Sequence, residues 1–428
     1  MEKKAKIIAT LGPAIYSNSK LKQLVNLGVD AFRINFSHNT NGINKIVSKI
    51  RKIEKSTSKK IALIADLQGV KLRVGKIKDD NQKIKYNQKY IFDSKKETGD
   101  NSRINFPYPK ILKKLKKGNK ILVDDGKFTF VVISKKGLAV TTICKSQNCL
   151  MKSNKSIHIP NFDISFNKLT IKDKKDIKTA IKLGCNWIAL SYLQNEKLIL
   201  ETRKLIKKDM GIISKIENKH ALKNITKIIK ATDSIMIARG DLAIDIGHSE
   251  VPKVQLSLIK KCSQFSKSVI VATQMLESMI ESPTPTRAEA SDVATAIFQG
   301  VDAVMLSAES AAGQYPQESV QMMDKIIKRV EADDKYKNNL SNYNLSHTKN
   351  TAEAIARAAF NVAEIIDSNC LVTFSKSGRS IVRVSRMRPD VTLVGLTSDI
   401  KVARQNALSA FCAQGRAWNR KWQISVWC

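Results

Sequence analysis

One segment near the middle of the chain reads Ile212-Ile213-Ser214-Lys215-Ile216-Glu217-Asn218. Its apolar, β-branched beginning is typical of a strand that is covered on both faces. Lys215 and Glu217 are two positions apart, so in an extended strand their side chains point to the same side. The segment therefore predicts a buried strand that presents a cation and a carboxylate together near its carboxyl end.

Similar buried-strand patterns alternate with amphipathic helical patterns through much of the sequence, three of them before residue 74 and five after residue 160. Strand–helix units in this number and order predict an α/β fold, a parallel (β/α)8 TIM barrel with an insertion after its third strand. The expected strands are Ile7–Thr10, Ala31–Asn35, Ile61–Ala65, Trp187–Ser191, Gly211–Lys215, Ser234–Ala238, Val269–Thr273 and Ala303–Ser307.

The inserted segment has a different pattern from the barrel. Short strand-like runs such as Phe128–Val132 are separated by glycine-containing turn signals, which is typical of an antiparallel sheet. A third strand-and-helix pattern starts near residue 340. We therefore expect a barrel domain of residues 1–73 and 160–338, a β-barrel-like lid domain of residues 74–159, and a C-terminal α/β domain of residues 339–428.

The chain is strongly basic, with 74 lysine and arginine residues, 38 aspartate and glutamate residues, and a formal net charge of +36. Such a charge attracts any polyanion. The lysines, however, recur along almost the whole chain and are not interleaved with aromatic residues that could stack on bases. We therefore expect no dedicated nucleic-acid binding, an expectation that salt-dependent retention on DNA would contradict.

The seven cysteines are scattered and have no metal-ligand spacing, which is typical of reduced thiols in the cytoplasm. The N-terminus has a basic start without an apolar core of signal-peptide length, and no segment approaches the length of a membrane span. These features predict a cytoplasmic protein without membrane association.

Polar side chains gather at the carboxyl ends of the expected barrel strands, which is where the active sites of such barrels lie. Carboxylates, cations and hydroxyl groups are combined there, and this combination suits an anion and a metal ion. The residues are Arg33, Asn35, Asp66, Lys215, Glu217, Arg239, Asp241, Thr273, Ser307 and Glu309.

Six motifs, in order over about residues 4–405, resemble those of the pyruvate kinase family. They are Lys6–Pro13, Arg33–His38, Ile213–Glu217, Ala238–Leu242, Ala272–Met279 and Pro285–Glu289. The resemblance implies a phosphotransferase that moves the phosphoryl group of phosphoenolpyruvate to ADP, which gives pyruvate and ATP in the last step of glycolysis. It also implies Mg²⁺ or Mn²⁺ as cofactor and a homo-oligomer, a tetramer in the family.

The resemblance assigns Lys215 to the transferring phosphoryl group, and Glu217 and Asp241 to Mg²⁺. Backbone N–H groups at Gly240 and Asp241 would hold the substrate carboxylate. An ion pair at the barrel rim is the alternative interpretation of Lys215 and Glu217, and an ordinary helix N-cap is the alternative for Asp241.

Thr273 corresponds to the family residue near the enolpyruvate carbon that must finally receive a proton. A threonine hydroxyl is too weak an acid to act alone, so a water chain with Ser307 and Glu309 is the expected route. Arg33 and Arg73 are candidate phosphate clamps, because a guanidinium group contacts oxygens in pairs. Arg33 is accordingly expected to be a catalytic and substrate-binding residue, together with Lys215 and Thr273.

The family's site for a monovalent cation would draw on Asn35, Ser37, Asp66 and the carbonyl of Leu67. Potassium-dependent members usually carry a glutamate where this chain has Lys71. We expect the ammonium group of Lys71 to lie near Asp66 and to replace K⁺, so that activity needs no added K⁺. A solvated loop lysine is the alternative interpretation.

Two further sites implied by the resemblance concern the nucleotide and an effector. Nucleotide contacts are expected from Arg73, Lys155 and Asn35, with the lid turn Asp124-Asp125-Gly126 facing the cleft; the same three residues are also a common plain turn signal. An effector-type phosphate loop is expected at Ser375, Lys376, Ser377, Gly378 and Ser380, since hydroxyl and N–H groups meet there before a helix. A turn without a ligand is the alternative for this loop.

After Gln405 the resemblance stops, and three of the four tryptophans fall in the remaining tail, at Trp418, Trp422 and Trp427. We interpret this shift as a truncated or out-of-frame ending that leaves the C-terminal domain incomplete. Three other function classes remain open: a barrel lyase acting on phosphoenolpyruvate or pyruvate, a basic nucleic-acid-binding protein, and a catalytically compromised enzyme.

Overall fold

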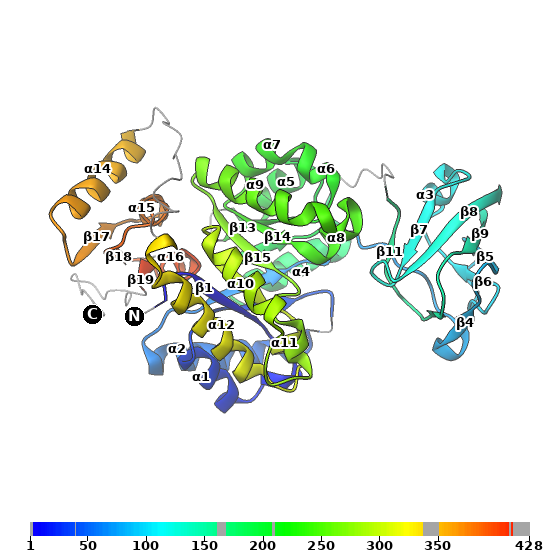
Figure 1. The fold of residues 1–428 in the computed structure, drawn as a ribbon, viewed down its shortest axis with the longest axis horizontal. Helices are drawn as coiled ribbons and strands as arrows, with labels where there is room; N and C mark the ends of the chain where they lie inside the picture. Colours follow the sequence, from blue (N-terminus) through cyan, green and yellow to red (C-terminus); the bar gives the residue numbers. More distant parts are fainter. Residues whose placement is uncertain are drawn as a thin grey trace.

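The computed structural model describes residues 3–38, 40–160, 168–207, 210–336, 351–410 and 412–413. Eight parallel strands close into a barrel in the order β1-β16-β15-β14-β13-β12-β3-β2, which confirms the TIM barrel (Figure 1). Almost every strand residue is buried because helices cover the outer face. The strands are β1 (Lys6–Thr10), β2 (Val29–Asn35), β3 (Ala62–Asp66), β12 (Trp187–Leu190), β13 (Gly211–Ile216), β14 (Ser234–Ala238), β15 (Ser268–Ala272) and β16 (Ala303–Leu306).

Amphipathic helices surround the barrel, and their buried residues recur every three or four positions, as Ile43, Ile46, Val47, Ile50 and Ile53 do in α2. The helices of this ring follow in chain order. They are α1 (Asn18–Asn26), α2 (Ile43–Thr57), α4 (Ile171–Lys182), α5 (Lys197–Ile206), α6 (Lys219–Lys223), α7 (Ile225–Ala231), α8 (Arg239–Ile246), α9 (Val251–Gln264), α10 (Arg287–Phe298), α11 (Ala308–Ala311) and α12 (Pro316–Glu331).

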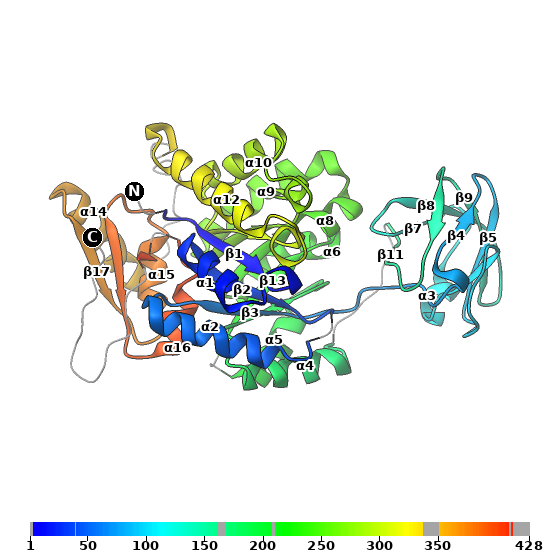
Figure 2. The same ribbon diagram turned by 90° about the horizontal axis from the view of Figure 1, so that it is seen from below.

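An antiparallel module is inserted between β3 and α4 and lies at one end of the barrel (Figure 2). A sheet in the order β11-β7-β8-β9-β5-β6 and a separate β4–β10 pair enclose its own core, in which Tyr90, Phe92 and Phe130 have ring centroids 5.3–5.6 Å apart. Its elements are β4 (Gln82–Ile84), β5 (Lys89–Asp93), β6 (Arg103–Asn105), α3 (Pro109–Lys114), β7 (Lys120–Val123), β8 (Phe128–Lys136), β9 (Ala139–Cys144), β10 (Cys149–Met151) and β11 (Ile157–His158).

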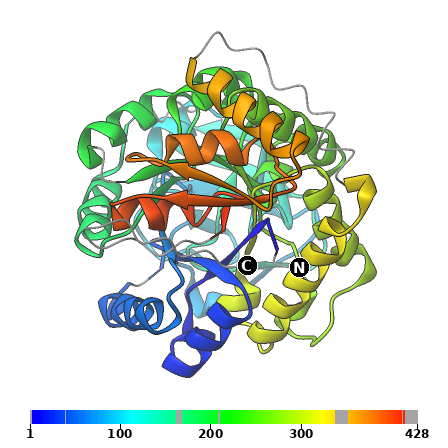
Figure 3. The same cartoon turned by 90° about the vertical axis from the view of Figure 1, so that its left-hand side faces the viewer.

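A C-terminal α/β unit lies at the opposite end of the barrel from the lid (Figures 1 and 3). Its parallel sheet has the order β17-β18-β19. The expected truncated tail falls on residue 411 and residues 414–428, which lie outside the described residues, so its interpretation stays a prediction. The elements are α14 (Thr351–Ile365), β17 (Cys370–Phe374), α15 (Arg379–Ser385), β18 (Thr392–Leu396), α16 (Ile400–Asn406) and β19 (Cys412–Ala413).

The segment after α16 closes the floor of the barrel, where the strands begin. Ala407 and Leu408 belong to the hydrophobic cluster of the barrel interior, and both are buried. At the same end Arg404 contacts both carboxylate oxygens of the buried Glu54 at 2.6–3.1 Å. The core of the barrel therefore continues into a part of the chain that lies more than 100 residues after β16.

Across the described ranges no helix combines the length and the apolar character that crossing a membrane requires.

The closed floor predicts that a truncation in the C-terminal unit weakens the barrel. Leu408→Ala removes a side chain packed inside the barrel, and we expect it to cost about 3 kcal/mol of unfolding free energy, since the cavity adds to the lost burial. The matched control is Leu200→Ala on α5, where the side chain is 52% exposed and a change within about 0.5 kcal/mol is expected. Urea unfolding followed by far-UV circular dichroism compares the two, and equal midpoints would contradict the floor contact.

Candidate active site

The strand-end residues come together at the carboxyl end of the barrel, on the side of the lid. Asn35 and Asp66 end β2 and β3, Lys215 is next to last in β13, and Thr273 directly follows β15. Parallel strands bring these positions to one edge because their carboxyl ends meet there. The structure thus assembles residues that are more than 200 positions apart in the sequence.

Asp66 is the centre of this group and its side chain is 1% exposed. Arg33 Nε donates to Asp66 Oδ2 at 2.7 Å, and Lys215 Nζ lies 3.2 Å from Asp66 Oδ1. Burial alone would raise the pKa of Asp66, but Lys215 and Arg33 outweigh burial and lower the pKa below its ordinary value. The carboxylate is therefore ionised at neutral pH and fixes two cations at the barrel mouth.

Lys215 is held from three sides. Besides Asp66, its Nζ lies 2.9 Å from Glu217 Oε1 and donates to Ser191 Oγ at 2.9 Å. Burial would lower the pKa of Lys215, but the carboxylates of Asp66 and Glu217 outweigh burial and raise the pKa. Lys215 thus stays a fixed positive charge. It forms the ion pair with Glu217 that the sequence analysis considered, and it also belongs to a buried network with Asp66 and Ser191.

Glu217 follows β13 and Asp241 lies in the first turn of α8, close enough for the charge of Asp241 to act on Glu217. Burial raises the pKa of Glu217; Lys215 opposes this effect, the negative charge of Asp241 adds to it, and the net direction is upward. A carboxylate whose ionised form is disfavoured by a neighbouring carboxylate is a common preparation for a divalent cation between the two.

The donor set of this pair fits Mg²⁺. Glu217 Oε1 is buried and ion-paired with Lys215 Nζ at 2.9 Å, and a carboxylate oxygen has a second lone pair that can serve a cation. Groups of three or more His, Cys, Asp or Glu side chains suited to a metal do not occur among the described residues. A site of two carboxylates leaves the remaining octahedral positions to substrate oxygens and water, which is how Mg²⁺ is usually held.

Thr273 occupies a strained turn after β15. Its φ is 71°, a left-handed conformation that is rare for a β-branched residue and is often found at functional sites. Arg239 holds this turn, because its NH2 group donates to the carbonyls of Thr273 and Gln274 at 3.0 and 3.1 Å. Thr273 Oγ1 in turn accepts the N–H of Gly240 at 2.9 Å. The turn and the start of α8 are thereby fixed to each other.

Glu309 and Ser307 lie on the neighbouring loop after β16. The carboxylate of Glu309 accepts the N–H groups of Ser307 and Leu276 at 2.7 and 3.2 Å, and burial raises its pKa despite these bonds. Ser307 Oγ is buried and has no hydrogen-bond partner. Glu309 is therefore chiefly a brace between two loops, while Ser307 has a hydroxyl available.

Lys71 lies elsewhere than the sequence suggested. Both oxygens of Asp66 are already occupied by Arg33 and Lys215. The ammonium group of Lys71 instead lies 3.2 Å from Asp241 Oδ1 and 3.2 Å from Asp125 Oδ1 of the lid turn. The expected position near Asp66 is thus corrected: Lys71 bridges the lid and the barrel beside Asp241. Burial would lower the pKa of Lys71, but Asp241 and Asp125 outweigh burial and raise it.

The other atoms expected at the monovalent-cation site take part in local hydrogen bonds. Asn35 Oδ1 accepts the N–H of Ser37 at 3.0 Å, and the carbonyl of Leu67 accepts a hydrogen bond from Ser191 Oγ at 2.6 Å. Asn35 and Asp66 are paired in the β2–β3 register, so all four atoms belong to one corner of the mouth. Their role in holding K⁺ stays a prediction.

The lid residues expected at the nucleotide lie where the chain enters and leaves the lid. Arg73 NH1 donates to the carbonyl of Asn154 at 2.8 Å, and Lys155 Nζ donates to Asp124 Oδ1 at 2.7 Å. A second lid contact reaches the barrel, because His158 Nε2 lies 3.1 Å from Asp245 Oδ1 on α8. The lid turn, Lys155 and Arg73 are therefore close to the mouth.

The expected effector loop lies between β17 and α15 in the C-terminal unit, at the far end of the molecule from the lid. Gly378 has a φ of 77°, and Asn406 is close enough that a side chain at this position would collide with it. The loop is thus held by α16, and its five expected phosphate-binding residues stay a prediction.

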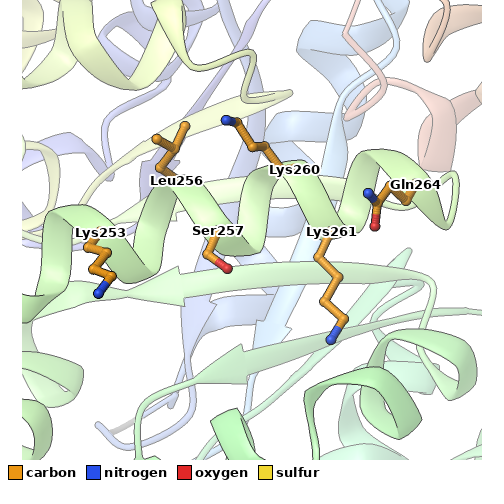
Figure 4. A pocket seen from close by; sticks show the side chains of 6 residues that line it. All are labelled: Lys253, Leu256, Ser257, Lys260, Lys261 and Gln264. Atoms are coloured by element: carbon orange, nitrogen blue, oxygen red, sulfur yellow. The ribbon is translucent and has the colours of Figure 1, made fainter. Parts of the chain in front are cut away.

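A shallow groove outside the mouth runs along α9 (Figure 4). Its lining comes from this helix alone and includes three lysines. Surface lysines on one helix do not define a ligand, so we assign no function to this groove. The lining residues are Lys253, Leu256, Ser257, Lys260, Lys261 and Gln264.

Two residues of the mouth escaped the sequence analysis, Ser191 and Tyr192, which directly follow β12. Ser191 links Lys215 to Leu67, and Tyr192 contacts Glu217 and Asp241. Their position at a strand end is the signal that could have identified them, since the same rule identified Asp66 and Thr273.

Comparisons with known proteins agree with this arrangement. The family model described as "Pyruvate kinase, barrel domain" matches residues 2–320, and the model described as "Pyruvate kinase, alpha/beta domain" matches residues 353–411. Similar proteins include the pyruvate kinase of Methylorubrum extorquens, 37% identical over 94% of this chain and 84% of the relative. A pyruvate kinase of Agrobacterium vitis is 39% identical over 95% and 86%, and that of Geobacillus stearothermophilus is 36% identical over 95% and 70%.

The low pKa of Asp66 gives a prediction for stability against pH. The pKa of Asp66 is lower in the folded chain than in the unfolded chain, where it is about 3.9. Ionised Asp66 therefore stabilises the fold at a pH above the unfolded-state pKa, and this stabilisation is lost as the pH falls through the folded-state pKa. Asp66→Asn should therefore cost about 3 kcal/mol, equally at pH 7 and pH 5. Urea unfolding at both values measures the difference.

Asp124→Asn is the matched control for this experiment. It breaks one partly exposed ion pair, with Lys155, and should cost no more than about 1 kcal/mol. A cost for Asp66→Asn that shrinks between pH 7 and pH 5 would show that the carboxylate titrates in this range and would contradict the prediction.

Proposed function

The chain belongs to the pyruvate kinase family and is a phosphotransferase, and we propose that the residues at its barrel mouth transfer the phosphoryl group of phosphoenolpyruvate to ADP. The observation that carries this proposal is the position of Lys215, whose ammonium group is fixed between Asp66 and Glu217. In the reaction the bond between the phosphorus atom and the enol oxygen breaks, a bond to a β-phosphate oxygen of ADP forms, and the enolpyruvate gains a proton.

Lys215 would stabilise the phosphoryl group as it moves. The charge of that group is spread over three oxygens, so catalysis consists mainly of positioning and electrostatic stabilisation. Because Asp66, Glu217 and Ser191 already hold the ammonium group, little reorganisation is needed when the substrate arrives. Arg33, fixed by Asp66 at the same edge, would add a second cation for the phosphate oxygens.

Glu217 and Asp241 would hold Mg²⁺, which supplies charge neutralisation and a template for the substrate oxygens. The N–H groups at the start of α8, at Gly240 and Asp241, would receive the substrate carboxylate. Arg73, Lys155 and Asn35 would bind the nucleotide from the lid side. The reaction would take place in the cytoplasm and in a homo-oligomer, as the sequence features and the family resemblance suggest.

Thr273 would stand beside the carbon that receives the proton. Its hydroxyl oxygen accepts the Gly240 N–H, which leaves the hydroxyl hydrogen free to point into the mouth. A threonine is too weak an acid to supply the proton by itself, so water and the available hydroxyl of Ser307 would complete the relay. Glu309, bound to two backbone amides, would position that loop.

Lys215→Met tests the proposed reaction. Pyruvate formation from phosphoenolpyruvate, ADP and Mg²⁺ should be present in the native protein and fall by at least about 10³-fold in the variant, because a pre-organised charge on the transition state is lost. Thr273→Ala should instead slow proton incorporation from solvent into pyruvate, measured by deuterium content in heavy water.

Lys204→Met, at an exposed position on α5, is the control for removing a lysine. Folded protein without any pyruvate formation would remove the proposed reaction. Native-like turnover in Lys215→Met would remove the role of Lys215, and normal proton incorporation in Thr273→Ala would remove the proton relay.

Lys71 supports a second prediction, activity without added K⁺. Its ammonium group already places a positive charge at the mouth, beside Asp241. In buffers with tetramethylammonium as the monovalent cation, the native protein should reach at least about half of its rate in K⁺, whereas Lys71→Met should lose activity and regain part of it with K⁺. A strict K⁺ requirement of the native protein would contradict this prediction.

A further inference from the structure

Tyr192 has an unusual backbone conformation at the barrel mouth. It follows Ser191 at the end of β12, and its φ is 54°. A bulky aromatic residue in the left-handed region is an outlier that persists only when its surroundings enforce it. The contacts of Tyr192 show what this conformation achieves.

Both ends of Tyr192 donate hydrogen bonds to carboxylates at the mouth. Its backbone N–H donates to Glu217 Oε2 at 2.6 Å, and its phenol hydroxyl donates to Asp241 Oδ1 at 2.8 Å. The two acceptors come from different elements, the end of β13 and the start of α8. One residue of the loop after a third strand, β12, therefore contacts both carboxylates.

These hydrogen bonds leave one oxygen of each carboxylate for another ligand. Glu217 Oε1 is ion-paired with Lys215 Nζ at 2.9 Å and keeps one of its two lone pairs. The contacts of Asp241 in the described part of the chain, from Tyr192 and Lys71, both reach Oδ1 and leave Oδ2 open. Tyr192 thus binds one oxygen of each carboxylate, and none of its hydrogen bonds uses the other oxygen.

The Tyr192 side chain contacts the mouth through its ring as well as through its hydroxyl. The ring also has Lys71 Nζ 6.0 Å from its centroid, so the aromatic face and the hydroxyl are both engaged.

We propose that Tyr192 is the positioning residue of the divalent-cation site, with its hydroxyl orienting Asp241 and its left-handed backbone orienting Glu217. This inference rests on the proposed function, in which Glu217 and Asp241 bind the metal ion. Groups that hydrogen-bond a metal ligand typically change metal affinity or activity about 10–100-fold when they are removed. A phenol that only filled space would have no such effect.

The test is the affinity of the substrate-free protein for Mn²⁺, measured from the electron paramagnetic resonance signal of the free ion. Tyr192→Phe, which removes a single oxygen, should weaken binding about 10-fold. In turnover assays it should raise the KM for Mg²⁺ by a similar factor while leaving kcat at saturating metal changed much less. The control is Tyr90→Phe, which removes a hydroxyl that donates to the Asp100 carbonyl within the lid, and which should bind Mn²⁺ like the native protein.

Two analogues at position 192 separate hydrogen bonding from packing. 4-Aminophenylalanine and 4-methylphenylalanine have nearly the same size, but only the first can donate to Asp241. Mn²⁺ affinity should be largely restored by the amino analogue and stay weak with the methyl analogue. This comparison also carries the test if Tyr192→Phe does not fold, as judged by far-UV circular dichroism.

Asp241→Asn distinguishes the failure of this inference from that of the proposed function. Loss of Mn²⁺ binding in Asp241→Asn together with native affinity in Tyr192→Phe would overturn the role of Tyr192 alone. Native affinity in Asp241→Asn would overturn the metal site itself. Equal affinities of the two analogues would also overturn the role of the hydroxyl.

Discussion

The buried ion pair between Asp66 and Lys215 is the interaction on which the barrel mouth depends. It joins the ends of β3 and β13, and Arg33 extends it to β2. Its desolvation is costly, and it is offset by the further contacts of the two residues with Arg33, Ser191 and Glu217. A surface pair would hold Lys215 loosely, whereas this one holds an ammonium group at a fixed point and leaves it beside Glu217. The position of the carboxylates, and hence of any cation between them, follows from it.

Much of the fold could be predicted from the sequence because its signals are local. Eight β-branched runs of four to seven residues define strands, and the rule that polar residues follow the carboxyl ends of such strands identified Asp66, Lys215 and Thr273. The alternation within β13 was enough to place Lys215 and Glu217 on one side. These inferences needed no knowledge of how distant segments pack.

The features that were missed or misplaced depend on distant segments. Lys71 was expected near Asp66 from the family resemblance, because it stands where potassium-dependent members carry a glutamate. Arg33 and Lys215, however, reach Asp66 from other strands and occupy both of its oxygens. The path of that loop is set by Gly69, whose backbone approaches the Ser191 carbonyl so closely that a Cβ atom would lie 2.6 Å from it. Tyr192 was missed because its importance lies in two hydrogen bonds to β13 and α8. A left-handed φ in a tyrosine has no sequence signature.

The closed floor of the barrel also constrains the order in which the molecule can be made. The lid is built from one continuous stretch and encloses its own core, so it can fold as soon as it leaves the ribosome. The barrel cannot do so, because Leu408 belongs to its interior and is synthesised about 100 residues after its last strand. At about 5–20 residues per second, the open end of the barrel stays exposed to solvent and to chaperones for several seconds. The lid can therefore be in place before the barrel and its floor are complete.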